Sequence, residues 1–496
     1  MLRRLLVLLS AFLLLLILIV GVNTLRHGSR QISVQAAPPL EIDEQLVARH
    51  LADSLKIRTI SYEVGKVSDP AAFDALHSLL ETSFPLVHQR LRREVIGKHS
   101  LLYIWEGRDK SALPVLLMAH QDVVPVAGGT EAQWQQPPFD GIVKDGFIWG
   151  RGAWDDKGNL FSILEATEKL LASGFQPERS IYFAFGHDEE VNGMNGASVI
   201  ADQLAARKLR FEFVLDEGLL VTEGILKGLK PAAALIGVAE KGYTTVNLSL
   251  EATPGHSSMP PQKTAIGMMS AALSQLEQQP FPAQMDGIAR QMFETIAPEM
   301  DGFNRVVLSN LWLFHPLLKK ELEKTGSTNA MLRTTTALTM VHAGNKDNVL
   351  PGHIDATVNF RTLPGDNEAS VVAHVKDVIA NPVIQVHPAP GGSAPSSVAP
   401  VDSDAYRTLS RSIREVFPNT IVAPGLMLGA TDSRYFVKLS DHIFKFSPVR
   451  AGSDDLPRFH GTNERISVKN YVEMIRFYRQ LILNSSQSAN KKEKSS

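Results

Sequence analysis

Val115-Leu-Leu-Met-Ala-His120-Gln-Asp122 is the stretch that decides the fold, because an apolar run ends abruptly in a histidine and an aspartate two residues apart. A short apolar run bounded by polar residues is typical of an interior strand of a parallel sheet. Residues i and i+2 of a strand project on the same side. His120 and Asp122 are therefore predicted to point together into the crevice beyond the strand's carboxyl end, where open α/β sheets bind ligands.

The same arrangement recurs further along the chain. Ile181–Phe185 runs into Asp188-Glu189-Glu190, and Phe211–Leu215 runs into Asp216-Glu217. A fourth cluster, Asp155-Asp156, opens a stretch whose apolar residues repeat at helical spacing. Carboxylates placed together repel and resist ionisation unless a cation holds them, so the pattern predicts a metal site. The alternative is a set of unrelated, solvated acidic loops.

The composition narrows the kind of site. Without any cysteine the chain has no disulfides and no thiolate ligands, so a histidine and carboxylate cluster suits divalent zinc, manganese or cobalt. A formal net charge of −2 gives no indication of nucleic-acid binding. With 496 residues, of which 44% are hydrophobic and 21% charged, the chain is expected to form two or three globular domains.

The first residues are predicted to cross a membrane. Arg3-Arg4 precedes an uncharged apolar run, Leu5–Val22, and the next charge is Arg26. Eighteen residues of helix span roughly 27 Å, close to the hydrocarbon thickness of a bilayer. Residues 1–25 are interpreted as a signal anchor, with the basic pair in the cytoplasm and the rest of the chain outside it (periplasmic, extracellular or lumenal). The alternative is a cleaved signal peptide and a secreted chain, for which Val34–Ala37 is a cleavage-type segment.

Alternating strand and helix patterns indicate the α/β class, with a mostly parallel sheet and helices on both faces. The pattern changes near Gly242, where Thr244–Leu250 alternates with a period of two, as a half-exposed strand does. Asp355–Arg361 is a second strand that can pair with it, so an α+β insertion is predicted. The predicted divisions are the anchor at 1–25, a linker at 26–43, a main domain in two parts at 44–239 and 367–483, the insertion at 240–366 and a disordered tail at 484–496.

Five motifs follow one another along the chain: His120-x-Asp122, Gly152-Ala-x-Asp155-x-Lys157-Gly158, Asp188-Glu189-Glu190, Asp216-Glu217-Gly218 and His460. In this order they resemble the two-metal aminopeptidase-fold hydrolases, a family that includes aminoacylase, carboxypeptidase S, carnosinase and succinyl-diaminopimelate desuccinylase. The resemblance extends from about Glu44 to Leu483. Gly186–Glu190 and His460–Arg465 resemble the carboxypeptidase S branch, with its secreted or membrane-anchored N-acyl-amino-acid hydrolases. The resemblance implies that the main domain is catalytic and zinc aminopeptidase-like, and that the insertion is a lid that often also forms a homodimer interface.

The resemblance implies two zinc ions per subunit, with cobalt or manganese as substitutes. The implied ligands are His120 on one metal, Glu190 and His460 on the other, and Asp155 as a bridge between the two. The remaining ligand of the first metal is Asp216 or Glu217. These neighbours point to opposite sides, and the aminoacylase pattern slightly favours Glu217.

Three further residues are implied to act in catalysis. Glu189 would be the general base that deprotonates water and then delivers the proton to the leaving amine. Asp122 would accept a hydrogen bond from the ring of His120 and so fix its tautomer. His256 would reach the scissile carbonyl from the lid, often from the partner subunit, and stabilise the oxyanion. Without the resemblance, His256 would be a surface residue and Glu189 a solvated or capping carboxylate.

The resemblance also implies residues that bind the substrate. Arg361 ends a lid strand, and its guanidinium can hold a substrate carboxylate with two hydrogen bonds; a surface ion pair is the alternative. Asn348, Gly429 and Thr431 lie in turns that resemble the family's other substrate-binding turns.

The predicted function is that of a metal-dependent hydrolase, which cleaves the amide next to a free C-terminal carboxylate in an N-acyl-amino acid or a short peptide. A dipeptidase, or an aminoacylase with a narrow acyl pocket, is the alternative within the same class of enzyme. An inactive receptor-like relative is the alternative from another class. Such a relative would have lost metal ligands or Glu189, and all of these residues are present.

Overall fold

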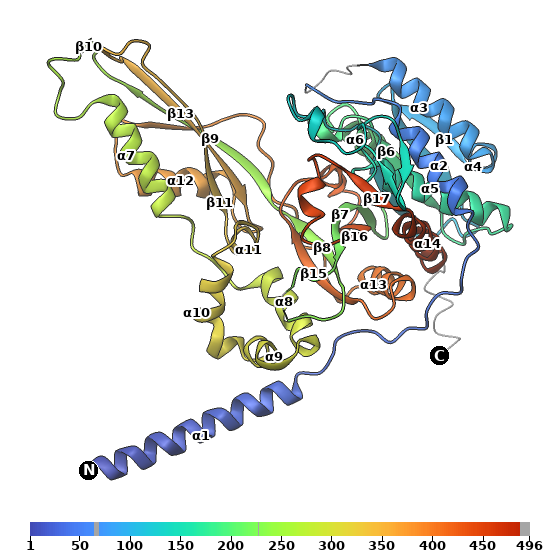
Figure 1. Cartoon of the computed structure of the whole chain (residues 1–496), viewed down its shortest axis with the longest axis horizontal. Helices are drawn as coiled ribbons and strands as arrows, with labels where there is room; N and C mark the ends of the chain where they lie inside the picture. The colour runs from blue at the N-terminus through green and yellow to red at the C-terminus, as the bar shows by residue number, and fades with distance from the viewer. Residues whose placement is uncertain (64–68, 227, 487–496) are drawn as a thin grey trace.

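The computed structural model describes residues 1–63, 69–226 and 228–486 (Figure 1). An eight-stranded sheet is built from β1 (Arg92–Ile96), β2 (Ser100–Trp105), β3 (Val115–His120), β6 (Ile181–Gly186), β7 (Val214–Thr222), β8 (Ala233–Glu240), β15 (Ile421–Met427) and β16 (Ile443–Ala451). Its strand order is β1-β2-β6-β3-β7-β16-β8-β15. The pairings β6-β3, β3-β7, β7-β16 and β8-β15 are parallel, whereas β1-β2 and β2-β6 are antiparallel. The predicted α/β class with a mostly parallel sheet is confirmed.

The central strands bury side chains on both faces of this sheet, which explains their unbroken apolar runs. Val115 and Leu117 of β3 pack in one core, and Leu116 and Met118 pack in another on the opposite face. The first face is covered by α2 (Glu44–Leu55), α3 (Pro70–Ser83), α4 (Pro85–Arg90), α5 (Lys157–Ala172), α13 (Asp404–Val416) and α14 (Val468–Ser485). The opposite face is covered by α6 (Ala197–Ala206) and the short helix η4 (Asp432–Phe436).

Several short elements lie around the ends of these strands. β4 (Ile142–Lys144), β5 (Phe147–Trp149) and β17 (Arg465–Ser467) form a three-stranded sheet. The remaining single turns of helix here are η1 (Glu131–Gln133), η2 (Glu189–Val191) and η5 (Leu456–Arg458).

The lid is built on a four-stranded antiparallel sheet that projects from the main body (Figure 1). Its strands, in spatial order, are β11 (Thr335–Ala343), β13 (His353–Thr362), β9 (Gly242–Glu251) and β14 (Gln385–Pro388). β9 alternates buried and less buried residues, as its period of two predicts. Its apolar side packs against α7 (Ala265–Gln278) and α12 (Glu368–Ile379). The short strands β10 (Gly255–His256) and β12 (Val349–Leu350) pair at its far end.

The limits of the lid differ from the predicted range of 240–366. α12 and β14 belong to the lid core, so the lid continues at least to Pro388. The turn at Pro364-Gly365, which resembles a domain boundary in the sequence, lies inside the lid. Conversely, a group of helices within the predicted insertion begins with α8 (Gly287–Ile296), which packs against β15 of the large sheet. The others are η3 (Ala297–Glu299), α9 (Gly302–Ser309), α10 (Leu311–Leu322) and α11 (Gly326–Leu332).

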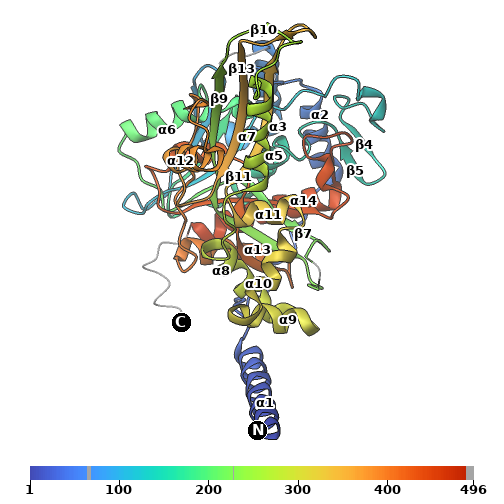
Figure 2. The ribbon, with the colours of Figure 1, turned by 90° about the vertical axis from the view of Figure 1, so that its left-hand side faces the viewer.

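The amino-terminal helix α1 (Leu2–Arg26) extends away from the body and buries none of its residues (Figure 2). Its most apolar window has a mean hydropathy of 3.3, and within the described ranges no other helix is long and apolar enough to cross a membrane. By length and composition α1 fits a signal anchor and a signal peptide equally well. At the other end of the chain, α14 reaches Ser485 and so includes the first two residues of the predicted tail, and 487–496 lie outside the described residues.

Candidate active site

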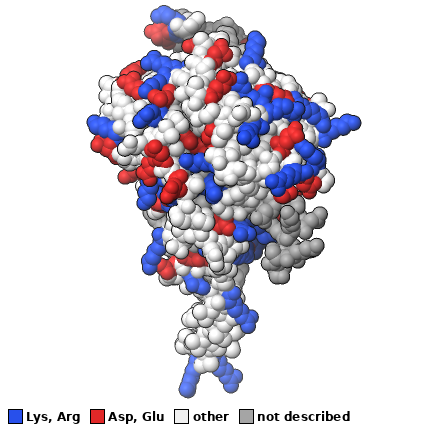
Figure 3. Space-filling model, turned by 90° about the vertical axis from the view of Figure 1, so that its right-hand side faces the viewer, with Lys and Arg blue, Asp and Glu red and all other residues white. Residues whose placement is uncertain are grey.

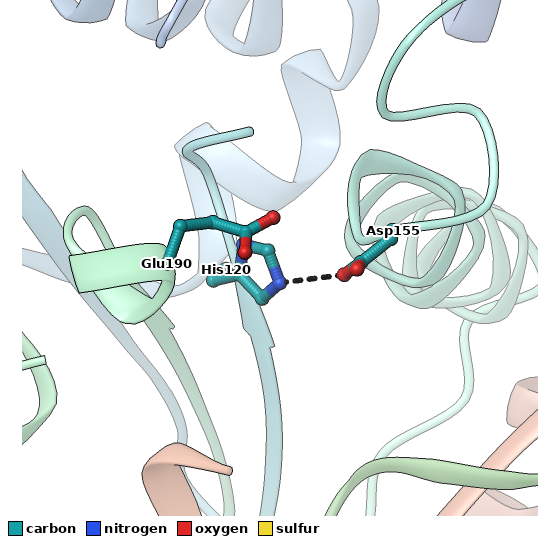
Figure 4. Close-up of side chains that lie close together, drawn as sticks. All are labelled: His120, Asp155 and Glu190. Atoms are coloured by element: carbon teal, nitrogen blue, oxygen red, sulfur yellow. Dashed lines mark hydrogen bonds and ion pairs between the residues drawn. The ribbon is translucent and has the colours of Figure 1, made fainter. Parts of the chain in front are cut away.

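The predicted metal ligands meet beyond the carboxyl ends of β3, β6 and β7. His120 is the last residue of β3, Glu190 lies in η2 just after β6, and Asp155 precedes α5. Figure 4 shows these three side chains converging from their separate elements. In a parallel sheet the carboxyl ends of neighbouring strands share one edge, so motifs far apart in sequence become neighbours in space.

Asp155 connects the two histidines of the cluster. His120 Nε2 lies 2.9 Å from Asp155 Oδ1, and His460 Nε2 lies 2.7 Å from Asp155 Oδ2. Glu217 Oε1 lies 3.5 Å from His120 Nε2, and Glu190 Oε2 lies 3.4 Å from His460 Nε2. The cluster therefore has two groups of donors, His120 with Glu217 and His460 with Glu190, which share one carboxylate.

Asp216 and Glu217, the two alternatives for the last ligand, have different surroundings. Asp216 Oδ2 accepts a hydrogen bond of 2.8 Å from the backbone N–H of Ser433, and its Oδ1 accepts one of 3.0 Å from the backbone N–H of Glu217. Glu217 instead faces His120. The geometry therefore favours Glu217 as the ligand.

A bulge in β7 explains this difference. The strand was predicted to end at Leu215, but it continues to Thr222. Asp216 pairs with Lys445 and Leu219 pairs with the next residue of β16, so two residues of β7, Glu217 and Gly218, have no partner. A β-bulge redirects side chains in this way. A bulge leaves little trace in the hydrophobic pattern, and for this reason the predicted strand was too short.

Asp122 is fully buried and supports two parts of the cluster at once. The Nδ1 of His120 lies 3.0 Å from the backbone oxygen of Asp122 and 3.3 Å from its Oδ1. A proton donated from Nδ1 leaves the Nε2 lone pair for a metal, as predicted. The Asp122 carboxylate also accepts hydrogen bonds of 3.1 Å from the backbone N–H groups of Glu189 and Glu190. This second role is not visible in the sequence.

The site concentrates negative charge. Burial and neighbouring carboxylates raise the pKa of Glu189, Glu190 and Glu217 well above the usual range. Burial lowers the pKa of His120, but the neighbouring carboxylates, Glu217 first among them, raise it well above its usual value. Glu190 Oε1 is buried and has no hydrogen-bond partner in the described part of the chain. The nitrogen and oxygen donors therefore fit a divalent cation such as zinc, which would neutralise this charge.

His256 and Asn348 lie at the far end of the lid. His256, in β10, pairs with Val349 of β12. The backbone N–H of Ser257 donates to the backbone oxygen of Asn348 at 3.1 Å. Both side chains are exposed. Figure 1 shows β10 at the tip of the lid, away from the large sheet. A single chain does not bring His256 or Asn348 to its own metal cluster.

Arg361 lies at the other end of the lid, where β13 approaches the main body. Its guanidinium lies 4.8 Å from the ring centre of Tyr243, and it makes no ion pair with any described residue. Burial and the nearby charge of Arg434 lower the pKa of Arg361. The surface ion pair considered as an alternative is therefore not observed.

Arg434 is a residue that the sequence reasoning missed. It lies in η4 and donates to the backbone oxygen of Asn192 at 2.8 Å. Burial lowers its pKa, but Tyr435, Asp432 and Glu189 raise it above the usual value. Its charge thus acts on both Arg361 and Glu189. The sequence contained one indication of such a role, because Arg434 directly follows the Thr431-Asp-Ser433 turn, which contains a predicted substrate-binding residue.

Thr431 is fully buried and has a structural role. Its backbone N–H and its hydroxyl contact Glu240 Oε2 at 3.1 and 3.2 Å, and its hydroxyl lies 2.6 Å from that of Ser433. The side chain is closed off from solvent in this structure, and its predicted contact with substrate stays a prediction. Gly429, two residues earlier, is partly exposed and stays a prediction.

A buried ion pair holds the two loops that carry Asp155 and His460. Arg151 Nη1 lies 2.6 Å from Glu464 Oε2, and Arg151 Nη2 donates to the backbone oxygens of His460 and Gly461. Glu464 Oε1 accepts from the backbone N–H groups of Gly152, Trp154 and Asp155. Both side chains are almost completely buried. Neither was predicted, although Glu464 lies in the His460–Arg465 motif.

Comparison with known families identifies the architecture. The model of peptidase family M20/M25/M40 matches residues 116–484. The chain belongs to this family. It is a metal-dependent hydrolase, as the sequence predicted, and the inactive relative considered as an alternative is not supported.

Similar proteins are found across the whole length of the chain. The probable carboxypeptidase S-like 2 of Dictyostelium discoideum is 39% identical over 95% of this chain and 92% of its own length. The N-fatty-acyl-amino acid synthase/hydrolase PM20D1 of Xenopus tropicalis is 39% identical over 96% of this chain and 95% of its own.

Solved structures show the same fold. The M20 family metallo-carboxypeptidase Sso-CP2 of Sulfolobus solfataricus has a TM-score of 0.62 at 19% identity, covering 89% of this chain and 99% of its own. Human carnosine dipeptidase 1 has a TM-score of 0.60 at 16% identity, covering 91% and 100%.

Proposed function

We propose that the chain removes an amino acid with a free C-terminal carboxylate from an N-acyl-amino acid or a short peptide. The observation that carries this proposal is Arg361, a half-buried guanidinium with no acidic partner among the described residues. An unpaired, partly desolvated cation is costly unless an anion joins it, and its fork matches a carboxylate. The names of the two similar proteins, carboxypeptidase S-like and N-fatty-acyl-amino acid synthase/hydrolase, agree with such a substrate.

The metal centre of this proposal has two zinc ions per subunit. His120 and Glu217 would hold one ion, His460 and Glu190 the other, and Asp155 would lie between them. When bound, such a pair of cations supplies Lewis-acid activation of water and of the scissile carbonyl. The support is that Asp155 offers one oxygen to each half of the cluster.

The chain's own groups would then move the proton and hold the substrate. Glu189 would take the proton from the attacking water and deliver it to the leaving amine. Asp122 would position Glu189 through the backbone N–H group. Arg361 would bind the carboxylate. His256 of the partner subunit would stabilise the oxyanion, in a homodimer formed through the lids.

α1 would act as a signal anchor that holds the catalytic domain outside the cytoplasm. The support is an uncharged run from Leu5 to Val22 that follows two arginines. A cleaved signal peptide and a secreted enzyme form the alternative.

The test of the proposed function compares free acids with amides. A C-terminally amidated substrate should be poor for the wild type supplied with zinc. Arg361→Ala should lower kcat/KM on N-acyl-amino acids and dipeptides far more than on their amides, since a charged partner is lost only with the acids. Arg361→Lys should restore activity in part, because a point charge cannot reproduce two parallel hydrogen bonds. Lys376→Ala, at an exposed position of α12 in the lid, serves as the control.

Equal kinetics of the wild type on an acid and its amide would contradict the proposal and favour a general amidohydrolase. The same panel separates the alternatives within the class. Activity confined to dipeptides, or to short acyl groups, would indicate a dipeptidase or a narrow aminoacylase.

A further inference from the structure

Helices α9 and α10 leave large apolar side chains in contact with solvent. The side chains of Phe303, Trp312 and Leu317 are 70%, 58% and 68% exposed. The only formally charged residue in the stretch 302–318 is Arg305. α10 has no buried residue at all. The rings of Phe303 in α9 and Phe314 in α10 lie edge to face with their centres 6.1 Å apart, so the apolar surface continues from one helix to the other. Contiguous exposed apolar residues of this size usually indicate a contact with another apolar body.

The same helices form hydrogen bonds with the carboxyl-terminal end of α1. Asn310, between α9 and α10, donates to Thr24 Oγ1 at 3.0 Å and to the Val20 oxygen at 3.3 Å. His27 Nδ1 lies 3.2 Å from Ser309 Oγ. Figures 1 and 2 both place α9 beside this end of α1.

The contact reaches into the apolar run of α1. The residues of α1 that are partly covered are Leu16, Val20, Asn23 and Thr24, and His27 just after the helix is partly covered as well. They recur at helical spacing on one face. Val22 ends the uncharged run, and Leu16 lies six residues inside it, which corresponds to about 9 Å along the helix axis. Amphipathic helices that lie in a membrane interface insert to a depth of about 5–10 Å. Therefore, if α1 spans a bilayer, α9 and α10 lie at the depth of its interface.

The predicted linker does not separate α1 from the body. The side chain of Gln31 exchanges two hydrogen bonds with the backbone of Val422, at 3.0 and 2.8 Å. The backbone N–H of Ala37 donates to the Glu415 oxygen at 2.7 Å. A segment held in this way does not behave as a flexible tether, so the body keeps a fixed orientation relative to α1.

We propose that α9 and α10 form a second membrane contact, with their exposed apolar side chains inserted in the outer interface of the lipid bilayer that α1 crosses. This inference rests on the proposed anchor role of α1. Helices that lie in a membrane interface combine apolar Trp, Phe and Leu side chains with a polar face rich in Lys and Arg. α9 and α10 offer both, because α10 carries Lys319 and Lys320 in its last turn. Figure 3 shows the stem of α1 as uncharged between basic groups near its two ends.

The absence of native cysteines makes a direct test practical. Leu317→Cys in the full-length chain would carry a nitroxide, with the protein reconstituted in phosphatidylcholine vesicles. Collisions with oxygen, which concentrates in lipid, and with a water-soluble nickel complex would be measured by electron paramagnetic resonance. Leu13→Cys in α1 and Val143→Cys, an exposed apolar position on β4, are the lipid and water references. All three sites are exposed, so the fold should tolerate them.

We expect the oxygen-to-nickel collision ratio at position 317 to be several-fold higher than at 143 and to approach that at 13. A ratio at 317 equal to that at 143, with 13 in lipid, would overturn the membrane contact and leave the anchor intact. Protection of 317 from both reagents would indicate a protein partner and would also overturn it. A collision ratio at position 13 equal to that at position 143 would overturn the proposed anchor and the membrane contact together.

Discussion

Glu189 and Glu190 are adjacent carboxylates with different surroundings. Glu190 Oε2 lies 3.4 Å from His460 Nε2. Within the part of the chain that the structure describes, Glu189 forms no ion pair with His120 or His460. Glu189→Gln should therefore keep the bound metal and lose about 10²–10⁴-fold in kcat, because it removes the base and no ligand. Metal content by elemental analysis and turnover would be measured on the same sample. A Glu189→Gln protein without metal, beside a Glu190→Gln protein that keeps it, would reverse the assignment.

The neighbours Asp216 and Glu217 provide a second test of this kind. Asp216 accepts two backbone hydrogen bonds, and Glu217 faces His120. Glu217→Gln should lower the metal content and the activity together. Asp216→Asn should keep the metal and lower the thermal stability, since the amide cannot accept both bonds as well as a carboxylate does. Titration with zinc and thermal melting would distinguish the two effects, and loss of metal in Asp216→Asn alone would contradict the geometry.

His120, Glu190 and Glu217 could be predicted to meet, because polar residues that follow apolar parallel strands share one edge of the sheet. Asp155 and His460 follow no such strand, and only the family resemblance placed them in the cluster. The choice between Asp216 and Glu217 as the metal ligand could not be predicted, because it depends on the bulge in β7. Arg434 and Glu464 were missed because a lone charged residue in a loop has no periodic pattern. The burial of the Thr431 hydroxyl against Glu240 could not be predicted either, because a short turn motif does not reveal it.

At the scale of elements, one ion pair fixes the loops before α5 and before β17. Glu464→Gln would leave the Arg151 charge buried without a partner, a change that typically costs about 3–5 kcal/mol. It would also loosen the loop that carries Asp155, so we expect a lower melting temperature and a weaker affinity for zinc. Asp441→Asn breaks an exposed ion pair with Arg210 and is the matched control, with an expected loss of at most about 1 kcal/mol.

Equal melting temperatures of Glu464→Gln and Asp441→Asn would contradict this role of the ion pair. A Glu464→Gln protein that melts at a lower temperature but binds zinc normally would show that the ion pair stabilises the fold without affecting the metal centre.

Element limits were harder to predict than element types. The strand that ends in His120 and the strand that precedes Glu190 were predicted within a residue of their ends, because both of their faces are buried. β14 was missed because four residues at the edge of a sheet show no alternation, and its pairing with β9 joins segments more than a hundred residues apart. As a result, the lid was predicted to end at 366, before two elements that belong to it.

At the scale of the whole molecule, the lid holds two predicted groups at opposite ends. Arg361 lies near the main body, and His256 lies at the tip, away from the metal cluster of its own chain. If His256 acts in catalysis, it must therefore do so in a second copy of the chain. The alternative, a surface residue without a role, makes a different prediction for mixed variants.

Co-expression of His256→Ala and Glu189→Gln chains, each inactive alone, decides between them. In a mixed dimer, the site with an intact Glu189 receives His256 from the Glu189→Gln chain and is complete, while the other site lacks both groups. Random pairing makes half of the dimers mixed, so activity should return to about a quarter of the wild-type value. Lys263→Ala, at an exposed lid position seven residues after His256 in the sequence, should be fully active. An unimpaired His256→Ala variant would support the surface residue, and no activity in the mixture would exclude a contribution from the partner.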